Sequence, residues 1–122
     1  MFTTRKVKGK TVVEISVKDM DSSIATAFRN FLVDAIEGTP DAIVIVDFSK
    51  VRFLDSTCLG ALLAAYRQTG SNRKLVLAAP QPSVENVFTV ARIGRAMLIV
   101  GSVEGAMGLT PEQWPLNQPG RH

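Results

Sequence analysis

The sequence predicts a single α/β domain in which a mixed β-sheet, a hairpin followed by parallel strands, has helices packed on it. Three observations carry this prediction. Two short β-type segments flank Gly9-Lys10, and strand-like and helical segments then alternate to about residue 107. The run AIVIVDF at 42–48 has the β-branched, nearly continuous apolar composition of a buried parallel strand. The 122 residues fit one domain whose core forms without disulfides or metal.

The opening hairpin is predicted from residues 4–8 and 11–17. In the second segment Val13, Ile15 and Val17 alternate with polar residues, which is the period of a half-buried strand. Because the two segments are separated only by Gly9-Lys10, we expect them to pair as antiparallel neighbours.

The basic residues of this hairpin admit two interpretations. The net charge is +3, and part of it sits in Arg5, Lys6, Lys8 and Lys10. On one strand, Lys6, Lys8 and Lys10 would share a face, which suits a nucleic-acid contact. No aromatic stacking residues are interleaved with them, so we favour lysines that protect a sheet edge from pairing. We therefore expect no specific nucleic-acid partner.

The first two helices and the strand between them follow from start and stop signals. Asp21-Ser22 starts a helix that Gly38-Thr39-Pro40 ends. The strand at 42–48 comes next, and a second helix runs from about Ser56 to Gly70. Its predicted apolar face consists of Leu59, Leu62, Leu63 and Tyr66.

The last elements are shorter. Residues 74–79 form a strand, and Pro82 sits in the first turn of a third helix with its apolar stripe at Val84, Val87, Phe88 and Ala91. A strand at 96–100 and a short helix at 103–107 complete the domain, which we expect to span 1–108. Residues 109–122 contain three prolines and are predicted to be a tail, with Trp114 as a possible anchor.

Composition limits the location and the chemistry. Cys58 is the only cysteine, which excludes an internal disulfide and fits a reducing cytoplasm. The N-terminus lacks the apolar core of a signal peptide, and no apolar run approaches the ~20 residues that span a bilayer. We therefore expect a cytoplasmic protein without a membrane partner.

Enzyme chemistry finds little support in the sequence. The only histidine is His122, so a Ser-His-Asp site is implausible. Cys/His clusters for zinc and glycine-rich phosphate loops are missing. Asp47 and Asp55 suggest either a metal or acid–base pair, or a strand end and a helix cap, and we favour the second. We predict no enzyme, no cofactor and no metal site.

The remaining concentration of polar residues is Asp55-Ser56-Thr57, at the predicted start of the second helix. All three residue types are good N-caps, so a cap is the simplest interpretation. One cap suffices, however, which leaves the other side chains available for function. In open α/β folds, the loops after the carboxyl ends of strands are the usual functional edge.

Residues 47–66 read DFSKVRFLDSTCLGALLAAY, which resembles the signature of the STAS domain, found in sulphate transporters and bacterial anti-sigma factor antagonists. The family pattern is a strand bearing an aspartate, a short link, an aromatic, then D-S-[ST]-G-L-G. Weaker similarity covers about residues 10–107 and includes Asp21, 86–93 and 102–106. The positions that match the central motif are Asp55, Ser56, Thr57, Leu59 and Gly60.

The resemblance implies a phosphorylation switch. In the family, the first serine of the motif, here Ser56, accepts phosphate from a kinase that is itself the anti-sigma factor. The unphosphorylated antagonist binds this kinase and frees the sigma factor, and a phosphatase resets the cycle. A helix N-terminus also favours an anion such as phosphate. The partner surface is expected to include Asp21, Asp55, Thr57 and Cys58.

Three departures from the family pattern affect this expectation. Cys58 stands where the family has glycine, and we expect its side chain to project at the partner surface. Lys18 and Arg92 replace two further glycines. For Cys58 a redox role is the alternative to a structural one, which we favour because Asp55 opposes thiolate formation.

Two other functions remain as hypotheses. In the first, the domain is a constitutive adaptor in a transporter or stressosome-like assembly, and its stable complex is unaffected by phosphate. In the second, the protein binds a small molecule through the loop at Asp55-Ser56-Thr57, although no glycine-rich ligand-binding motif supports this.

Overall fold

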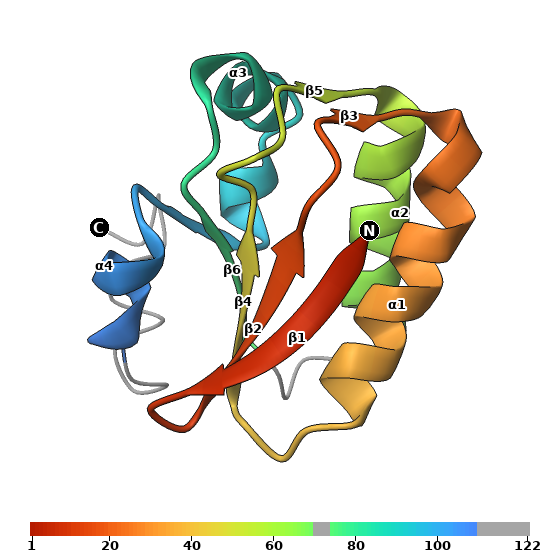
Figure 1. Ribbon diagram of the computed structural model, residues 1–122. Coiled ribbons are helices and arrows are strands. Elements are labelled where there is room, and N and C mark those ends of the chain that lie inside the picture. The colour runs from red at the N-terminus through yellow and green to blue at the C-terminus, as the bar shows by residue number, and fades with distance from the viewer. Residues whose placement is uncertain (70–73, 110–122) are drawn as a thin grey trace.

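A computed structural model describes residues 1–69 and 74–109 of the chain. Its main sheet has five strands in the order β1-β2-β4-β6-β7. β1 is antiparallel to β2, whereas each later neighbour is parallel, which confirms the predicted mixed sheet (Figure 1). The strands are β1 Phe2–Val7, β2 Lys10–Ile15, β4 Ile43–Asp47, β6 Lys74–Ala78 and β7 Leu98–Val100.

Helices cover both faces of this sheet. α1 (Ala25–Glu37) and α2 (Ser56–Gln68) pack side by side on one face, and the short α4 (Val103–Met107) lies on the other (Figure 1). α3 (Pro82–Val90) lies toward the end of the sheet at which β4 and β6 finish. Successive residues of a strand therefore belong to two apolar clusters on opposite faces of the sheet. Val13 and Val44 belong to the cluster that faces α1 and α2, and Val12 and Ile45 belong to the cluster that faces α4.

The hairpin turns at Lys8-Gly9, and both residues have positive φ, 51° and 78°. Two successive positive φ angles are what a two-residue I′ hairpin turn requires. This turn places Lys6 and Lys10 on different strands and different sheet faces, so the hairpin lysines do not share the face that a single strand would give them. Lys10 Nζ donates to the carbonyl of Met107 in α4 at 3.1 Å, whereas Lys6 points toward the end of α1.

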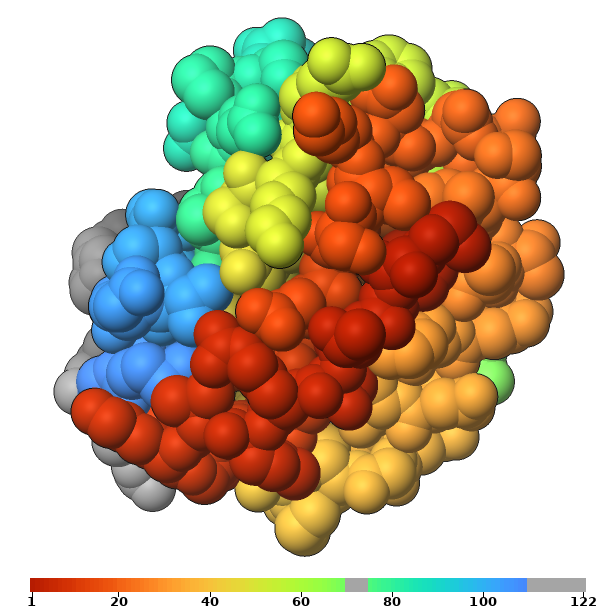
Figure 2. All heavy atoms as spheres, in the orientation of Figure 1, coloured from red at the N-terminus to blue at the C-terminus, as the bar shows by residue number. Residues whose placement is uncertain are grey.

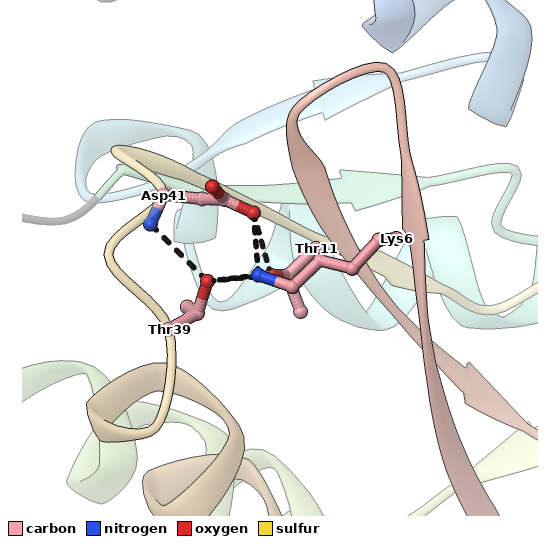
Figure 3. A network of polar contacts seen from close by, with 4 residues as sticks. All are labelled: Lys6, Thr11, Thr39 and Asp41. Atoms are coloured by element: carbon pink, nitrogen blue, oxygen red, sulfur yellow. Dashed lines mark hydrogen bonds and ion pairs between the residues drawn. The ribbon is translucent and has the colours of Figure 1, made fainter.

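Lys6 belongs to a polar network that ties the hairpin to the loop between α1 and β4 (Figure 3). Its Nζ donates to Thr39 Oγ1 and, at 2.8 Å, to Asp41 Oδ2. The hydroxyl of Thr11 also donates to Asp41 Oδ2, at 2.9 Å. Thr11 and Thr39 are the buried polar side chains of the described chain, so this network satisfies groups that water cannot reach.

Replacing Asp41 by asparagine is expected to lower the free energy of unfolding at pH 7 by about 1 kcal/mol, because charge-assisted bonds from Lys6 and Thr11 are weakened. The hydrogen bond from Lys6 holds the pKa of Asp41 below the usual aspartate value. A depressed native pKa means that this stabilisation is present above the unfolded-state pKa of ~4 and is lost as pH falls through the native pKa. Urea unfolding at pH 7 and pH 3 measures the difference.

Asp34→Asn is the matched control, since Asp34 is an exposed carboxylate of α1. Its substitution is expected to change stability by no more than about 0.5 kcal/mol. Equal losses for the two variants, or a loss for Asp41→Asn that does not shrink at acid pH, would contradict the role given to the network.

Several short elements were not predicted. β3 (Asp19–Met20) and β5 (Phe53–Leu54) form a separate two-stranded parallel sheet, and single 3₁₀ turns occur at Ser22–Ile24 and Ile93–Arg95. Arg92 has φ 57°. This left-handed conformation favours glycine, which explains why the family pattern has glycine there.

Of the predicted tail, residues 109–122, the structure describes only Leu109. Leu109 is half-buried and packs against the apolar cluster between the sheet and α4, which contains Val12 and Ile45. Its N–H donates to the carbonyl of Ala106 at 3.2 Å. Residues 110–122, with Trp114, lie outside the described residues, as does the predicted end of the second helix at Gly70. α2 ends at Gln68, with Thr69 as its C-cap.

Candidate functional site

The two short strands place two similar turns next to each other at one end of the molecule. β3 pairs with β5 in the register Asp19↔Phe53 and Met20↔Leu54, and each strand leads directly into a helix start (Figure 1, top). The N–H of Asp55 donates to the carbonyl of Met20 at 3.0 Å, which extends the pairing by one residue. This end follows the carboxyl ends of β2 and β4, where open α/β sheets carry their sites.

Asp55 is the N-cap of α2, as predicted. Its Oδ1 accepts hydrogen bonds from the N–H groups of Thr57 and Cys58, each at 3.1 Å, and from the hydroxyl of Thr57. The bond from the Thr57 hydroxyl and the bond from the Cys58 N–H are the main causes that lower the pKa of the Asp55 carboxyl. The carboxylate therefore stays ionised at neutral pH.

Asp21 repeats this arrangement one strand away. Its Oδ1 accepts the N–H of Ser23 at 3.0 Å and the hydroxyl of the same residue. The backbone of Asp21 is extended, like that of Asp55, and caps the 3₁₀ turn before α1. The pairing of β3 with β5 thus brings both aspartates to one surface, which we call the apical face and define as Asp21, Asp55, Ser56 and Thr57.

The two hydroxyls that follow Asp55 differ in their surroundings. Both Ser56 and Thr57 are exposed. The hydroxyl of Thr57 donates a hydrogen bond to the Asp55 carboxylate. The hydroxyl of Ser56 makes no hydrogen bond to any residue that the structure describes. Of the two, Ser56 is therefore the one whose oxygen is available for reaction with an external group.

Cys58 does not project at the surface, and that expectation is wrong. Its side chain is 0% exposed, and its Sγ lies 3.2 Å from the carbonyl oxygen of Asp21. The reason is helical geometry: Cys58 shares a face with residues three, four and seven positions further on, which is the face that packs inward. The fully or nearly buried residues of α2 are Cys58, Ala61, Leu62 and Ala65, while the expected Leu59, Leu63 and Tyr66 are half-buried.

The thiol of Cys58 is expected to react slowly with an alkylating reagent in the native protein between pH 6 and 8. Burial, followed by the charges of Asp55 and Asp21, raises its pKa to about 11, so the reactive thiolate is scarce. The chain has one cysteine, so the loss of free thiol reports this site alone. The same protein in urea is the control and should react at the rate of a free thiol. Rapid native reaction at pH 6 would instead support a redox role.

The metal and acid–base interpretation of Asp47 finds no support at this end of the sheet. Asp47 closes β4, and its Oδ1 accepts the N–H of Ser49 at 2.9 Å. Within residues 1–69 and 74–109, no three His, Cys, Asp or Glu side chains gather in a way that would hold a metal ion. In the same ranges, no helix is both long and apolar enough to cross a membrane.

Sequence reasoning found the residues of the apical face but missed the pairing that assembles it. The signal was present as a repeat: Met20-Asp21-Ser22-Ser23 and Leu54-Asp55-Ser56-Thr57 have the same order of one apolar residue, one aspartate and two hydroxyls. In both copies the apolar residue is buried and the aspartate is a cap.

Comparison with known proteins finds similarity in sequence family and in fold. The family model described as Mlab, STAS domain, matches residues 2–101. A crystal structure of an anti-sigma factor antagonist from Mycobacterium paratuberculosis is similar, with TM-score 0.78, 20% identity, and coverage of 88% of this chain and 90% of that chain. A crystal structure of a protein from Thermotoga maritima that is described as a candidate anti-sigma factor antagonist has a TM-score of 0.76 and 20% identity, and the match covers 87% of this chain and 91% of that chain. The structure of the anti-sigma factor antagonist SpoIIAA in its unphosphorylated form has a TM-score of 0.70 and 22% identity, and the match covers 88% of this chain and 93% of that chain.

Proposed function

Because the chain belongs to the STAS domain family, we propose that it is an anti-sigma factor antagonist that is switched by phosphorylation of Ser56. Unphosphorylated, it binds an anti-sigma factor that is also a serine kinase with a histidine-kinase-like ATPase fold, and thereby releases a sigma factor in the bacterial cytoplasm. Phosphorylation of Ser56 dissociates this complex, and a phosphatase that removes the phosphate allows the chain to bind again. The chain is the substrate of its partner and supplies no catalysis itself.

The observation that carries the proposal is the contrast between neighbouring hydroxyls. Ser56 is exposed at the first position of α2 and its hydroxyl is not engaged by any described residue, whereas Thr57 donates to Asp55. A phosphoacceptor must present its oxygen to the nucleotide in the partner. Ser56 meets this requirement without breaking any bond that stabilises the helix start.

The cap also affects where a phosphate would act. The carboxylate of Asp55 already occupies the N–H groups of Thr57 and Cys58. These amides are therefore already engaged and would not donate to a phosphate on Ser56, although the helix dipole still favours an anion at this position. This supports a phosphate that is directed outward, where the partner meets it beside the charges of Asp55 and Asp21.

The proposal is tested by incubating the chain with ATP and the histidine-kinase-like ATPase encoded nearest to it, then mapping phosphate by mass spectrometry. Phosphate is expected on Ser56, and Ser56→Ala should remove it. Phosphate on Thr57 alone would reassign the acceptor. A stable complex whose affinity is unaffected by phosphate would favour a constitutive adaptor instead.

A further inference from the structure

An exposed aromatic side chain lies beside the apical face. Within the described chain, the large apolar side chains that are exposed are Met1, Phe53 and Val90. Phe53 is 50% exposed, and it precedes Ser56 by three positions, which limits the separation of their Cα atoms to roughly 10 Å. It also pairs with Asp19, directly before the turn that holds Asp21.

The backbone around Phe53 is held in place from two sides. The N–H groups of Arg52 and Phe53 both donate to the carbonyl of Lys18, at 2.8 and 3.2 Å. On the other side, the hydroxyl of Ser83 at the start of α3 donates to the carbonyl of Arg52 at 2.7 Å. Leu54 is buried, so the alternation of the strand turns the ring of Phe53 away from the core. The backbone that carries the ring is thus held in place and would lose little conformational freedom on binding.

Phe53 has charged neighbours of both signs, Arg52 in sequence and Lys18 and Asp19 across the β3–β5 pairing. Asp19 is neutralised by Arg52, whose Nε lies 3.0 Å from Asp19 Oδ1. Neither Asp21 nor Asp55 forms an ion pair with any residue that the structure describes. Two carboxylates without an ion pair to a described residue therefore lie at the end formed by β3 and β5, to which the exposed Phe53 also belongs. This end is the upper part of the view in Figure 2.

We propose that Phe53 is the apolar anchor of the partner-binding face and fixes which partner is recognised. The occupant is the anti-sigma kinase of the proposed function, on which this inference rests. Its complementary surface would have an apolar pocket for the ring, bordered by basic side chains that meet Asp21 and Asp55. A buried aromatic anchor beside complementary charges is the usual composition of an interface hot spot.

The test is calorimetry of the full chain against the histidine-kinase-like ATPase encoded nearest to it, at low and high salt. Phe53→Ala is expected to weaken binding about 30-fold, by nearly the same factor at both salt concentrations, because the lost contact is apolar. Asp21→Asn keeps the cap, since asparagine also caps helices, and its smaller loss should diminish at high salt. Phe53→Tyr, which retains the ring, should bind within about threefold of the unaltered chain.

Val90→Ala is the matched control. Val90 is 75% exposed on α3, seven positions beyond Ser83 and therefore roughly 10 Å along the helix from the support of Phe53. It should bind like the unaltered chain. If the unaltered chain binds but Phe53→Ala binds equally well, or Val90→Ala loses as much, the anchor is refuted while the proposed function stands. If the unaltered chain does not bind the kinase, the proposed function fails and the anchor fails with it.

Discussion

Ser56→Asp is expected to weaken binding to the partner kinase by about tenfold or more, while Ser56→Ala keeps the affinity and loses its response to ATP. The aspartate adds one negative charge to a surface that already carries Asp21 and Asp55. Like charges brought together at an interface can cost several kcal/mol, and each ~1.4 kcal/mol is a factor of ten in affinity. A phosphate, with about −1.5 to −2 charges and a larger volume, should have the greater effect.

The effect of Ser56→Asp should arise from the interface and not from the fold. Ser56 is exposed, and the cap of α2 is provided by Asp55, so the variant should unfold at nearly the same temperature. An acidic residue in the first turn of a helix is even mildly favourable. Thr3→Asp is the control for charge alone, because it adds the same charge to the exposed edge strand β1, outside the apical face. Its affinity should not change.

A salt series distinguishes the two contributions to the Ser56→Asp effect. The electrostatic part is screened at high ionic strength, and the steric part is not. An equal loss of affinity for Ser56→Asp and Thr3→Asp would show that net charge, and not the position of Ser56, controls binding. That result would contradict the assignment of the switch.

The second large effect is expected in the core. Phe88→Ala should lower the free energy of unfolding by about 3–5 kcal/mol, the usual range for removing a fully buried phenylalanine. Phe88 is 0% exposed, and its ring meets that of Phe48 edge-on, with centroids 5.2 Å apart and an interplanar angle of 80°. This contact attaches α3 to the segment that follows β4, so its loss should also loosen the support of the apical face.

Val90→Ala, on the same helix, is again the control. Val90 is 75% exposed, and an exposed substitution of this kind usually changes stability by less than about 0.5 kcal/mol. Urea unfolding of both variants measures the difference. Similar losses for the two would mean that α3 does not pack as the structure shows.

The regular elements were predictable because their signals are local. The continuous β-branched run at 42–48 appears as β4, Pro82 opens α3, and Asp55 caps α2, as expected from composition and capping chemistry. β3 and β5 were missed because a strand of two residues is too short to show any period. Their existence depends on pairing between segments more than thirty positions apart, which no local pattern contains.

The errors at the site have a similar origin. The inner face of α2 was assigned to its largest apolar residues, but of these only Leu62 is fully buried. The small residues Cys58, Ala61 and Ala65 complete the inner face, because α1 packs closely against α2. Cys58 therefore lies in the core at the position where a surface contact was expected. In each case tertiary packing, and not composition, decided where the side chain points.

The most direct test of the central claim is the affinity of the phosphorylated chain for its kinase. The chain is phosphorylated to completion, the position of the phosphate is verified by mass spectrometry, and both forms are titrated against the same kinase by calorimetry. If phosphorylation of Ser56 is the switch, the phosphorylated form should bind on the order of 100-fold more weakly, with an unchanged unfolding temperature. Equal affinity of the two forms, with phosphate on Ser56, would contradict it.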